Sequence, residues 1–441
     1  MTLRLITALL AGTTFLVGCA EPEVILPGQR DSINSVLDAD AVVDTQDRIV
    51  NQSVAFSAPS MTTNANWAQA AGTPSTRTAH PALSAAPALA WSVNIGEGDG
   101  KRQRISTDPI VVDGVIYTMD AQSTVSAVSA AGTLLWQVNL TPQTENRGDA
   151  FGGGFAYGDG RLFVTTGYGA VHAMDPKSGA IEWSQSVMGA GVSRPAYYDG
   201  LVYVVSSDAN SWAIEAVDGH VLWRIDSVSD VNNLTGSVAP AVSDRFVIFG
   251  YGSGEVQAAF RKGGLIYWNS SLTGGRAGRS IGVVEDIATT PMIVGDRVYA
   301  ANGSGRFVAM SLDNGERVWT SSQGVRGDVW VAGGSVFFIN DLGQLLRADA
   351  ATGDALWAVD LPGFLKQHPK RSKEVYAHHG PVLAGGQIVV ASNDGMIRFF
   401  DPTNGAMVRS VAIPDGATTS PVVAGGVLYL VSQKGDLHAF R

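Results

Sequence analysis

A glycine followed four residues later by a tryptophan recurs along most of the chain, and this repeat restricts the possible folds more than any other feature. The repeat tryptophans are Trp91, Trp136, Trp183, Trp223, Trp268, Trp319 and Trp357, and Arg409 occupies the next expected position. The glycines that precede every position after Trp91 are Gly132, Gly179, Gly219, Gly264, Gly315, Gly353 and Gly405. The mean spacing of about 45 residues is typical of four-stranded propeller blades.

Each repeat unit also has the same internal order of signals. A hydrophobic run reaches a tight turn, as at Asp113-Gly114, Asp199-Gly200 and Gly425-Gly426, which suits a hairpin that needs positive φ. A second strand with an aromatic residue and a short third strand follow, and the glycine then lets the backbone turn into the strand that carries the tryptophan. We expect the large indoles to cover the gaps between adjacent sheets.

The two ends of the repeat region predict how the ring closes. Trp91 lies on an isolated strand at about 88–95, whereas the last unit, 418–441, supplies only three strands. Together they make one complete unit, while an open solenoid would leave Trp91 unpaired. The prediction for residues 87–441 is therefore an all-β, eight-bladed propeller of four-stranded antiparallel blades, closed by pairing of the N- and C-terminal strands.

The N-terminal region has a different character. Residues 1–18 have a basic flank and a short apolar stretch, as in a signal peptide, and end in Leu16-Val17-Gly18 before Cys19. This site resembles the lipobox of bacterial lipoproteins, which implies cleavage before Cys19, attachment of acyl chains to it and, with Ala20 next, transfer to the outer membrane. An ordinary signal peptide with an accidental cysteine is the alternative. Residues 19–86 lack a sustained apolar period and are expected to form a largely extended tether.

Composition excludes several function classes. The chain has 30 basic and 40 acidic residues, a net charge of −10, so it lacks the electrostatic basis for nucleic-acid binding. Its single cysteine allows neither an internal disulfide nor a cysteine-rich metal site.

Three short motifs call for a separate interpretation. The letters of a nucleophile elbow at 278–282, with Ser280 at the centre, lie in a glycine-rich connection rather than in the strand-to-helix turn that the motif requires. His378 and His379 would point to opposite faces of a strand, so we expect no metal there. The basic run 366–373 is expected to be a solvated loop, or else a contact with anionic lipid or an acidic partner.

The repeats resemble those of pyrroloquinoline-quinone-type propellers. With the lipobox, the acidic tether, Asn66-Trp67, Gly72 and His80-Pro81, the chain resembles the BamB family, the lipoproteins of the outer-membrane β-barrel assembly machinery. The resemblance implies a non-enzymatic scaffold at the periplasmic side of the outer membrane. It implies binding to the POTRA domains of BamA and to other subunits of that complex, with no cofactor except the lipid on Cys19.

The resemblance also implies partner-binding loops. The BamA contact of the family matches Leu234 and Thr235 in one stretch and Asp286 and Ile287 in another. Thr235 replaces an expected arginine and Ala288 an expected second acidic residue, so the contact is expected to be weaker or rebuilt by neighbours. The alternative is that these residues only shape the loops.

Two other functions remain as alternatives. A periplasmic quinone-dependent dehydrogenase would share the fold, but the enzymes of that family use a pair of adjacent cysteines that this chain lacks. A sugar- or peptidoglycan-binding propeller lipoprotein is the third possibility, and only its exposed aromatic residues would support it.

Overall fold

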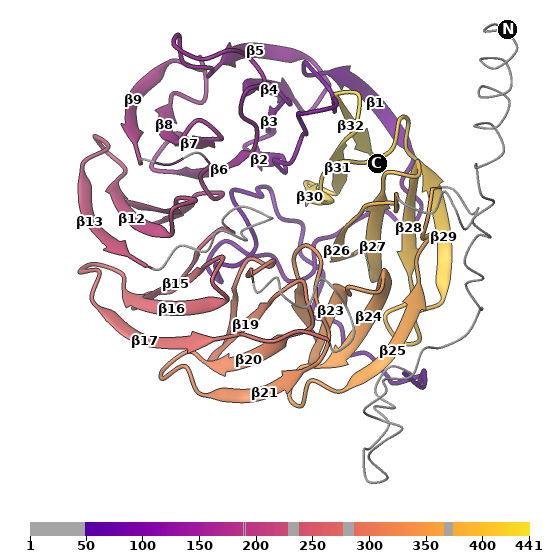
Figure 1. Cartoon of the computed structure of the whole chain (residues 1–441). Helices are drawn as coiled ribbons and strands as arrows, with labels where there is room; N and C mark the ends of the chain where they lie inside the picture. The colour runs from indigo at the N-terminus through magenta and orange to yellow at the C-terminus, as the bar shows by residue number, and fades with distance from the viewer. Residues whose placement is uncertain (1–48, 188, 190, 228–237, 277–285, 366–373) are drawn as a thin grey trace, which may run out of the picture. The chain divides into compact units, whose positions relative to one another are not determined.

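Eight β-sheets stand around one axis in the computed structural model (Figure 1). The structure describes residues 49–187, 189, 191–227, 238–276, 286–365 and 374–441. Each sheet is antiparallel and has four strands, so the predicted all-β, eight-bladed propeller is confirmed. Within the described ranges, no helix is long and apolar enough to cross a membrane.

Blades 1 to 4 each consist of four consecutive strands, which run in sequence order from the inside of the ring to the outside. Blade 1 is β2 (Ile110–Val112), β3 (Val115–Met119), β4 (Thr124–Ser129) and β5 (Leu134–Asn139). Blade 2 is β6 (Gly153–Gly158), β7 (Arg161–Thr166), β8 (Ala170–Met174) and β9 (Ile181–Ser186). Blade 3 is β10 (Ala196–Tyr198), β11 (Leu201–Val205), β12 (Asn210–Glu215) and β13 (Val221–Asp226). Blade 4 is β14 (Ala241–Val242), β15 (Phe246–Gly250), β16 (Glu255–Phe260) and β17 (Ile266–Ser271).

Blades 5 to 7 repeat this arrangement. Blade 5 is β18 (Met292–Val294), β19 (Arg297–Ala301), β20 (Phe307–Ser311) and β21 (Arg317–Ser321). Blade 6 is β22 (Trp330–Ala332), β23 (Ser335–Ile339), β24 (Gln344–Asp349) and β25 (Ala355–Asp360). Blade 7 is β26 (His378–Ala384), β27 (Gln387–Ser392), β28 (Met396–Phe400) and β29 (Met407–Ala412).

Blade 8 joins the two ends of the propeller chain. It consists of β30 (Val422–Ala424), β31 (Val427–Val431) and β32 (Asp436–Phe440), with β1 (Leu89–Asn94) as its outer strand. β1 pairs with β32 in a register that places Trp91 opposite Ala439. Ala88 and Arg441 exchange backbone hydrogen bonds of 2.8 and 2.9 Å, so the predicted closure by the N- and C-terminal strands is confirmed.

The hydrophobic core lies between neighbouring blades rather than at the centre of the ring. Phe163 of blade 2, for example, belongs to one buried cluster with Val202 and Val204 of blade 3. The second strand of most blades is buried along nearly its whole length, whereas the outer strands alternate between exposed and half-buried residues. Each sheet therefore buries both faces, which explains the near-continuous apolar runs of the inner strands.

The tryptophan repeat connects each blade to the next one. The indole of Trp136 in blade 1 lies against Gly179 of blade 2, where an added Cβ would come within 2.7 Å of the ring. Its Nε1 donates a hydrogen bond to the carbonyl of Pro176 at 3.0 Å. The same contact recurs from Trp91 to Trp357, and the seven glycines have φ between 67° and 83°. Glycine is thus required twice, for its positive φ and for the space that the indole fills.

Arg409 departs from the repeat for a structural reason. The next blade in the ring is blade 8, whose third and fourth strands, β32 and β1, come from opposite ends of the propeller and are joined by no turn. No turn glycine is therefore available to receive an indole. The Arg409 guanidinium instead lies 3.8 Å from the centre of the Phe399 ring and donates to the side chain of Gln387.

Residues 49–86, which the sequence analysis assigns to the tether, lie against the ring. Residues 49–57 run along blades 6 and 7, where Gln52 donates to the carbonyl of Leu356 at 2.9 Å. Arg347 is buried and donates to the carbonyls of Val54 at 2.7 Å and Ala55 at 3.1 Å. The sequence pattern misses this packing because it depends on pairing with the blades rather than on an apolar period.

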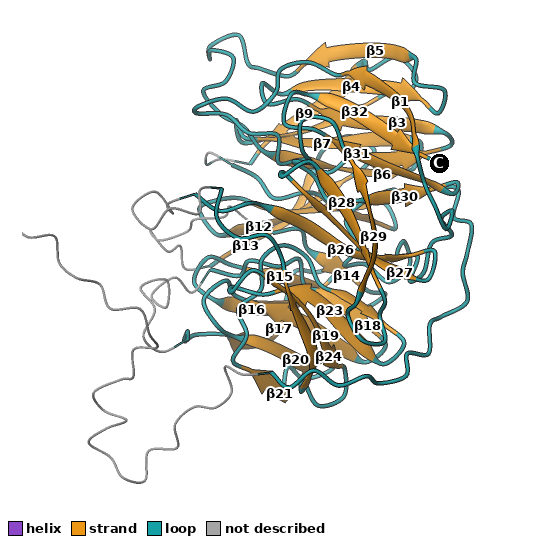
Figure 2. Cartoon of the chain, turned by 90° about the vertical axis from the view of Figure 1, so that its right-hand side faces the viewer, coloured by secondary structure: helices purple, strands orange, loops and turns teal. Residues whose placement is uncertain are grey.

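The ring has two different faces, which Figure 2 shows from the side. One face carries the connections from the outer strand of each blade to the inner strand of the next, and we call it the connection face. The opposite face carries the turns between first and second strands, such as Asp113-Gly114, and we call it the hairpin face. Residues 62–82 lie on the hairpin face and reach the inner strands there.

Candidate functional site

The main cavity of the described structure is a funnel at the centre of the connection face. It has a volume of about 900 Å³. Its wall is made mostly of residues from the connections that precede the inner strands, together with turn residues between second and third strands, and includes Asp99, Arg104, Phe151, His379, Asn393 and Gln433. A cavity built from many blades at once is suited to receiving a protruding part of a ligand or partner.

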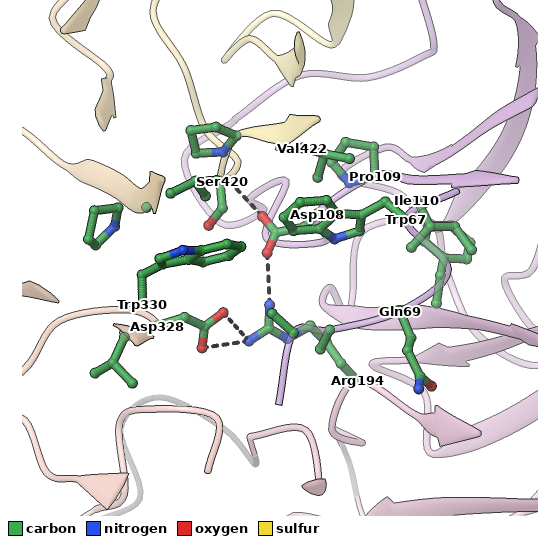
Figure 3. Close-up of a pocket in the computed structure, with 18 residues that line it drawn as sticks. Trp67, Gln69, Asp108, Pro109, Ile110, Arg194, Asp328, Trp330, Ser420 and Val422 are labelled. Carbon is green, nitrogen blue, oxygen red and sulfur yellow. Dashed lines mark hydrogen bonds and ion pairs between the residues drawn. The ribbon is translucent and has the colours of Figure 1, made fainter. Parts of the chain in front are cut away.

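An ion-pair network forms the floor of this funnel (Figure 3). Arg194 donates to the carboxylate of Asp108 at 2.8 Å and to that of Asp328 at 3.0 Å. It also donates to Thr290 Oγ1 at 2.8 Å. The backbone N–H of Ser420 completes the network by donating to Asp108 at 2.7 Å. Five blades are thus connected across the axis.

The two carboxylates respond differently to this environment. Burial raises the pKa of Asp108, and the positive charge of Arg194 offsets only part of that effect. Burial acts in the same direction on Asp328, but Arg194 and the hydrogen bonds from Thr290 outweigh it and lower its pKa. One guanidinium therefore serves two carboxylates, which leaves a net negative charge at the funnel floor.

A pair of stacked indoles lies below the ion-pair network. Trp67, from the N-terminal segment, stacks on Trp330 of blade 6 with ring centres 5.9 Å apart. A cavity of about 40 Å³ separates these rings from Asp108, Arg194 and Asp328. The N-terminal segment contacts the inner strands on the hairpin face, whereas the residues that line the funnel belong to the connection face.

The sequence contains a signal for this floor that our sequence analysis missed. A Ser/Thr-x-Pro triplet precedes several inner strands, and its middle residue is Asp108, Arg194, Thr290 or Ser420. The hydroxyl of the first residue accepts a backbone hydrogen bond from the second strand, as Ser193 does from Val205 at 2.9 Å. The triplet thereby holds the middle side chain toward the axis.

The residues predicted to bind a partner have different positions. Leu234 and Thr235 lie outside the described residues, but Val238, which follows them, lines the funnel. Asp286 and Ile287 are buried, with 2% and 1% exposure, and Ile287 forms a β-bridge with Asn302. Their burial favours the alternative that these two residues shape the loop rather than touch a partner.

Described residues in or next to the predicted contact stretches nevertheless line one cavity, the funnel. Ala288, which follows Ile287, lines the funnel together with Val238. Val375 also lines it and follows the basic run 366–373, which itself lies outside the described residues. The described residues Val238, Ala288 and Val375, which lie in or just after the three stretches considered as contacts, therefore all line the same funnel.

The remaining chemical candidates of the sequence analysis are a serine, the single cysteine and two adjacent histidines. Ser280 and Cys19 lie outside the described residues. His378 contacts Ser392 Oγ at 2.7 Å and the carbonyl of Pro362 at 2.9 Å, so its ring is held by the fold. Among the residues that the structure describes, no group of three or more histidine, cysteine or acidic side chains could hold a metal ion.

Comparisons with known proteins agree on one family. A family model described as "Outer membrane protein assembly factor BamB" matches residues 121–359 and 349–441. The assembly factor BamB of Yersinia pestis is 25% identical over 360 residues, which cover 80% of this chain and 88% of that protein.

Solved structures show the same fold. The crystal structure of BamB from Moraxella catarrhalis has a TM-score of 0.66 at 18% identity and covers 81% of this chain and 100% of that one. The quinohemoprotein alcohol dehydrogenase of Comamonas testosteroni has a TM-score of 0.64 at 15% identity and covers 85% of this chain and 80% of that one. At these identities the likeness extends to the fold alone, which an assembly factor and an enzyme share.

Proposed function

The chain belongs to the BamB family of outer membrane protein assembly factors, and on this premise we propose that it is a non-enzymatic scaffold that binds the periplasmic POTRA domains of BamA. The observation that carries the proposal is the funnel of the connection face. Val238 and Ala288 line it, and each follows a stretch that corresponds to the family's partner-binding loops. A rigid ring that presents several loops around one cavity suits a docking surface.

The proposed contact uses the rim of the funnel rather than its floor. Arg194 already donates to Asp108, Asp328 and Thr290, so the floor is a closed network. Of the positions at which the sequence departs from the expected contact, Ala288 lines the funnel, and Thr235 lies outside the described residues. We therefore assign affinity to a few rim residues and shape to Asp286 and Ile287.

Membrane attachment through Cys19 is the second part of the proposal. Twenty-nine residues, 20–48, lie between Cys19 and Ile49, the first described residue. A chain of that length reaches at most about 100 Å when fully extended. More than one acyl chain gives stable anchoring. An anchored scaffold has a high effective concentration near its partners, so individual contacts can be weak. This part of the proposal places the protein at the periplasmic side of the outer membrane.

Binding of purified BamA POTRA domains to the full chain tests the partner assignment. Leu234→Ala combined with Thr235→Ala should weaken binding at least tenfold, and Ala288→Arg should weaken it by placing a bulky side chain of the opposite charge where the family is expected to carry an acidic residue. Leu135→Ala is the matched control, because Leu135 is 52% exposed on the outer strand β5. Its binding should equal that of the unmodified chain.

Two outcomes would contradict the proposal. If the unmodified chain binds no POTRA domain, the partner is wrong. If the Leu135→Ala control weakens binding as much as the rim variants do, the surface is wrong. A quinone-dependent dehydrogenase, the alternative function, would instead show cofactor absorbance and calcium-dependent quinone binding in the same preparation.

A further inference from the structure

Residues 62–82 make one circuit of the hairpin face and contact the inner part of every blade; we call this segment the belt. The circuit begins at blade 8, where Asn64 accepts from Gly425 N–H at 2.7 Å and donates through its side chain to the carbonyl of Val423 at 2.8 Å. At blade 1, Trp67 and Val111 exchange backbone hydrogen bonds of 2.7 and 3.0 Å. In Figure 1 the indigo chain lies inside the circle of blades.

Blades 2 to 5 are contacted by residues 68–73 of the belt. Tyr157 N–H of blade 2 donates to the carbonyl of Ala68 at 2.9 Å. The side-chain amide of Gln69 pairs with the backbone of Tyr197 in blade 3, at 2.7 and 3.2 Å. Thr73 Oγ1 accepts from Val242 N–H of blade 4 at 3.1 Å, and the carbonyl of Gly72 accepts from Ile293 N–H of blade 5 at 3.1 Å.

The circuit ends at blades 6 and 7. Arg77 donates to the carbonyl of Val331 and lies over the Trp330 ring, and Trp330 Nε1 donates to the carbonyl of Ala79 at 3.1 Å. In blade 7, Gly386 N–H donates to His80 Nε2 at 2.8 Å and Gly385 N–H donates to the carbonyl of Pro81 at 3.1 Å.

The contacted positions are equivalent in the repeat. In seven blades the belt contacts the residue that lies two positions before the first hairpin turn, namely Val111, Tyr157, Tyr197, Val242, Ile293, Val331 and Val423. These residues lie on inner strands, whose inner edge has no neighbouring strand in the sheet. The ring therefore presents a circle of backbone groups, and a circle of open strand edges is a template for an extended polypeptide.

The belt also closes on itself. Thr62 N–H donates to the carbonyl of His80 at 3.0 Å, and Ala82 N–H donates to the carbonyl of Thr62 at 2.9 Å. The two ends of the segment are thereby paired as a parallel bridge between Thr62 and Pro81. The contact with eight blades and the closure of the loop make the belt a continuous element rather than a set of local contacts.

We propose that the axis of the hairpin face is a binding site for one extended polypeptide and that the belt is the segment bound there. The bound belt holds the ring closed independently of the β1–β32 pairing, and we call this second closure the lock. Its chemistry is recognition of the backbone groups of the inner strands by the backbone of the belt and by polar side chains such as Gln69 and Thr73. The Trp67 indole and Gly72 are the shape determinants. Gly72 is packed so closely that an added Cβ would lie 2.4 Å from the carbonyl oxygen of Pro291.

The position of the belt in the chain suits it to protect β1 from a pull on the anchored end. This role rests on the proposed membrane anchor. The belt lies between Cys19 and β1, the strand that closes the ring. A pull on the anchored end would first meet the contacts of residues 49–57 with blades 6 and 7. Beyond them the belt distributes the force over hydrogen bonds to eight blades before it can reach β1 and separate it from β32.

Hydrogen exchange of backbone amides in the purified full chain tests the lock. Gly72→Ala should speed exchange at least tenfold at Val242 and Ile293, which lie beside the substitution, and also at Val111 and Tyr157 in blades 1 and 2. Gly98→Ala is the matched control, because an added Cβ there would also lie 2.4 Å from a carbonyl oxygen, that of Gln433, but outside the belt. It should leave these amides protected.

Faster exchange confined to Val242 and Ile293 would overturn the proposal, because the contacts would then be independent. If Gly72→Ala fails to fold, the milder Gln69→Ala, which removes the two hydrogen bonds to Tyr197, should give the same spread of exchange to Val111 and Tyr157. The two closures are then compared by combining either belt variant with Trp91→Ala in β1. Each single variant should keep most of the ring protected and the combination should lose that protection, whereas simple additivity would refute a second lock.

These measurements need neither membrane nor partner. A failure of the belt experiment therefore leaves POTRA binding untouched, and a failure of POTRA binding leaves the belt as a lock of the ring.

Discussion

Replacing Arg194 by methionine removes the charge that two carboxylates share at the funnel floor while keeping most of the side-chain volume. In the variant, Asp108 and Asp328 would still be partly buried, which costs desolvation free energy. They would no longer have the guanidinium that compensates for this cost. The network is partly hydrated, because the side chains of Arg194, Asp108 and Asp328 are 23%, 21% and 26% exposed.

The expected size of the effect follows from these contacts. At an effective dielectric constant of about 20, each ion pair at about 4 Å between charge centres is worth about 4 kcal/mol before desolvation is counted. Breaking a buried ion pair by removing one partner costs about 3–5 kcal/mol. Because the funnel admits some water, we expect Arg194→Met to lower the free energy of unfolding at pH 7 by about 3 kcal/mol, the lower end of that range.

The pH dependence identifies the cause. The pKa of Asp108 is already raised in the folded state, and loss of Arg194 raises it further and also raises that of Asp328. A carboxyl with a raised folded-state pKa binds its proton more tightly when folded, so its penalty is largest above that pKa and is relieved as the pH falls. The cost of Arg194→Met should therefore shrink between pH 7 and pH 5.

Urea unfolding at both pH values measures this cost. Adding Asp328→Asn to Arg194→Met should recover part of the stability, because one of the two unpaired charges is removed. Arg224→Met is the control, since Arg224 pairs with Asp226 on an exposed outer strand and should matter little. An equal cost at pH 7 and pH 5, or no recovery in the double variant, would show that the arginine acts through packing rather than through its charge.

Three further predictions concern other parts of the chain. Trp136→Ala should lower the free energy of unfolding by about 3 kcal/mol, because it empties the space against Gly179 and removes the hydrogen bond to Pro176; chemical unfolding measures the loss. Burial lowers the pKa of both His172 and His379 to about 4. Their contribution to stability is therefore complete above the unfolded pKa of about 6.5 and is lost as the pH falls toward 4. Replacing both by glutamine should make the free energy of unfolding fall less between pH 7 and pH 5, as measured by chemical unfolding. Cys19→Ala should release the protein from the membrane fraction into the soluble one, and retention in the membrane would refute lipid anchoring at this residue.

The sequence predicted the ring but not the contacts at its centre. The glycine and tryptophan of each repeat lie four residues apart, and Trp91 and the three strands at 418–441 are complementary halves of a blade, so blade number and closure could be read from local periodicity. The partner stretches were placed by resemblance alone. Two of their residues, Asp286 and Ile287, are buried, which no spacing in the sequence indicated.

The belt was assigned to an extended tether for a related reason. A segment such as 62–82 has no apolar period that would reveal it, and most of its hydrogen bonds go to strands that are distant in the sequence. Glycine and turn residues, by contrast, act on their immediate neighbours in the chain, and the tryptophan recurs four residues after the glycine, so the sequence alone determined eight blades and the position of the seam. Only the tertiary structure decided that Asp108, Arg194 and Asp328 meet, since 86 and 134 residues separate the arginine from its two partners and only a closed ring brings them to one axis.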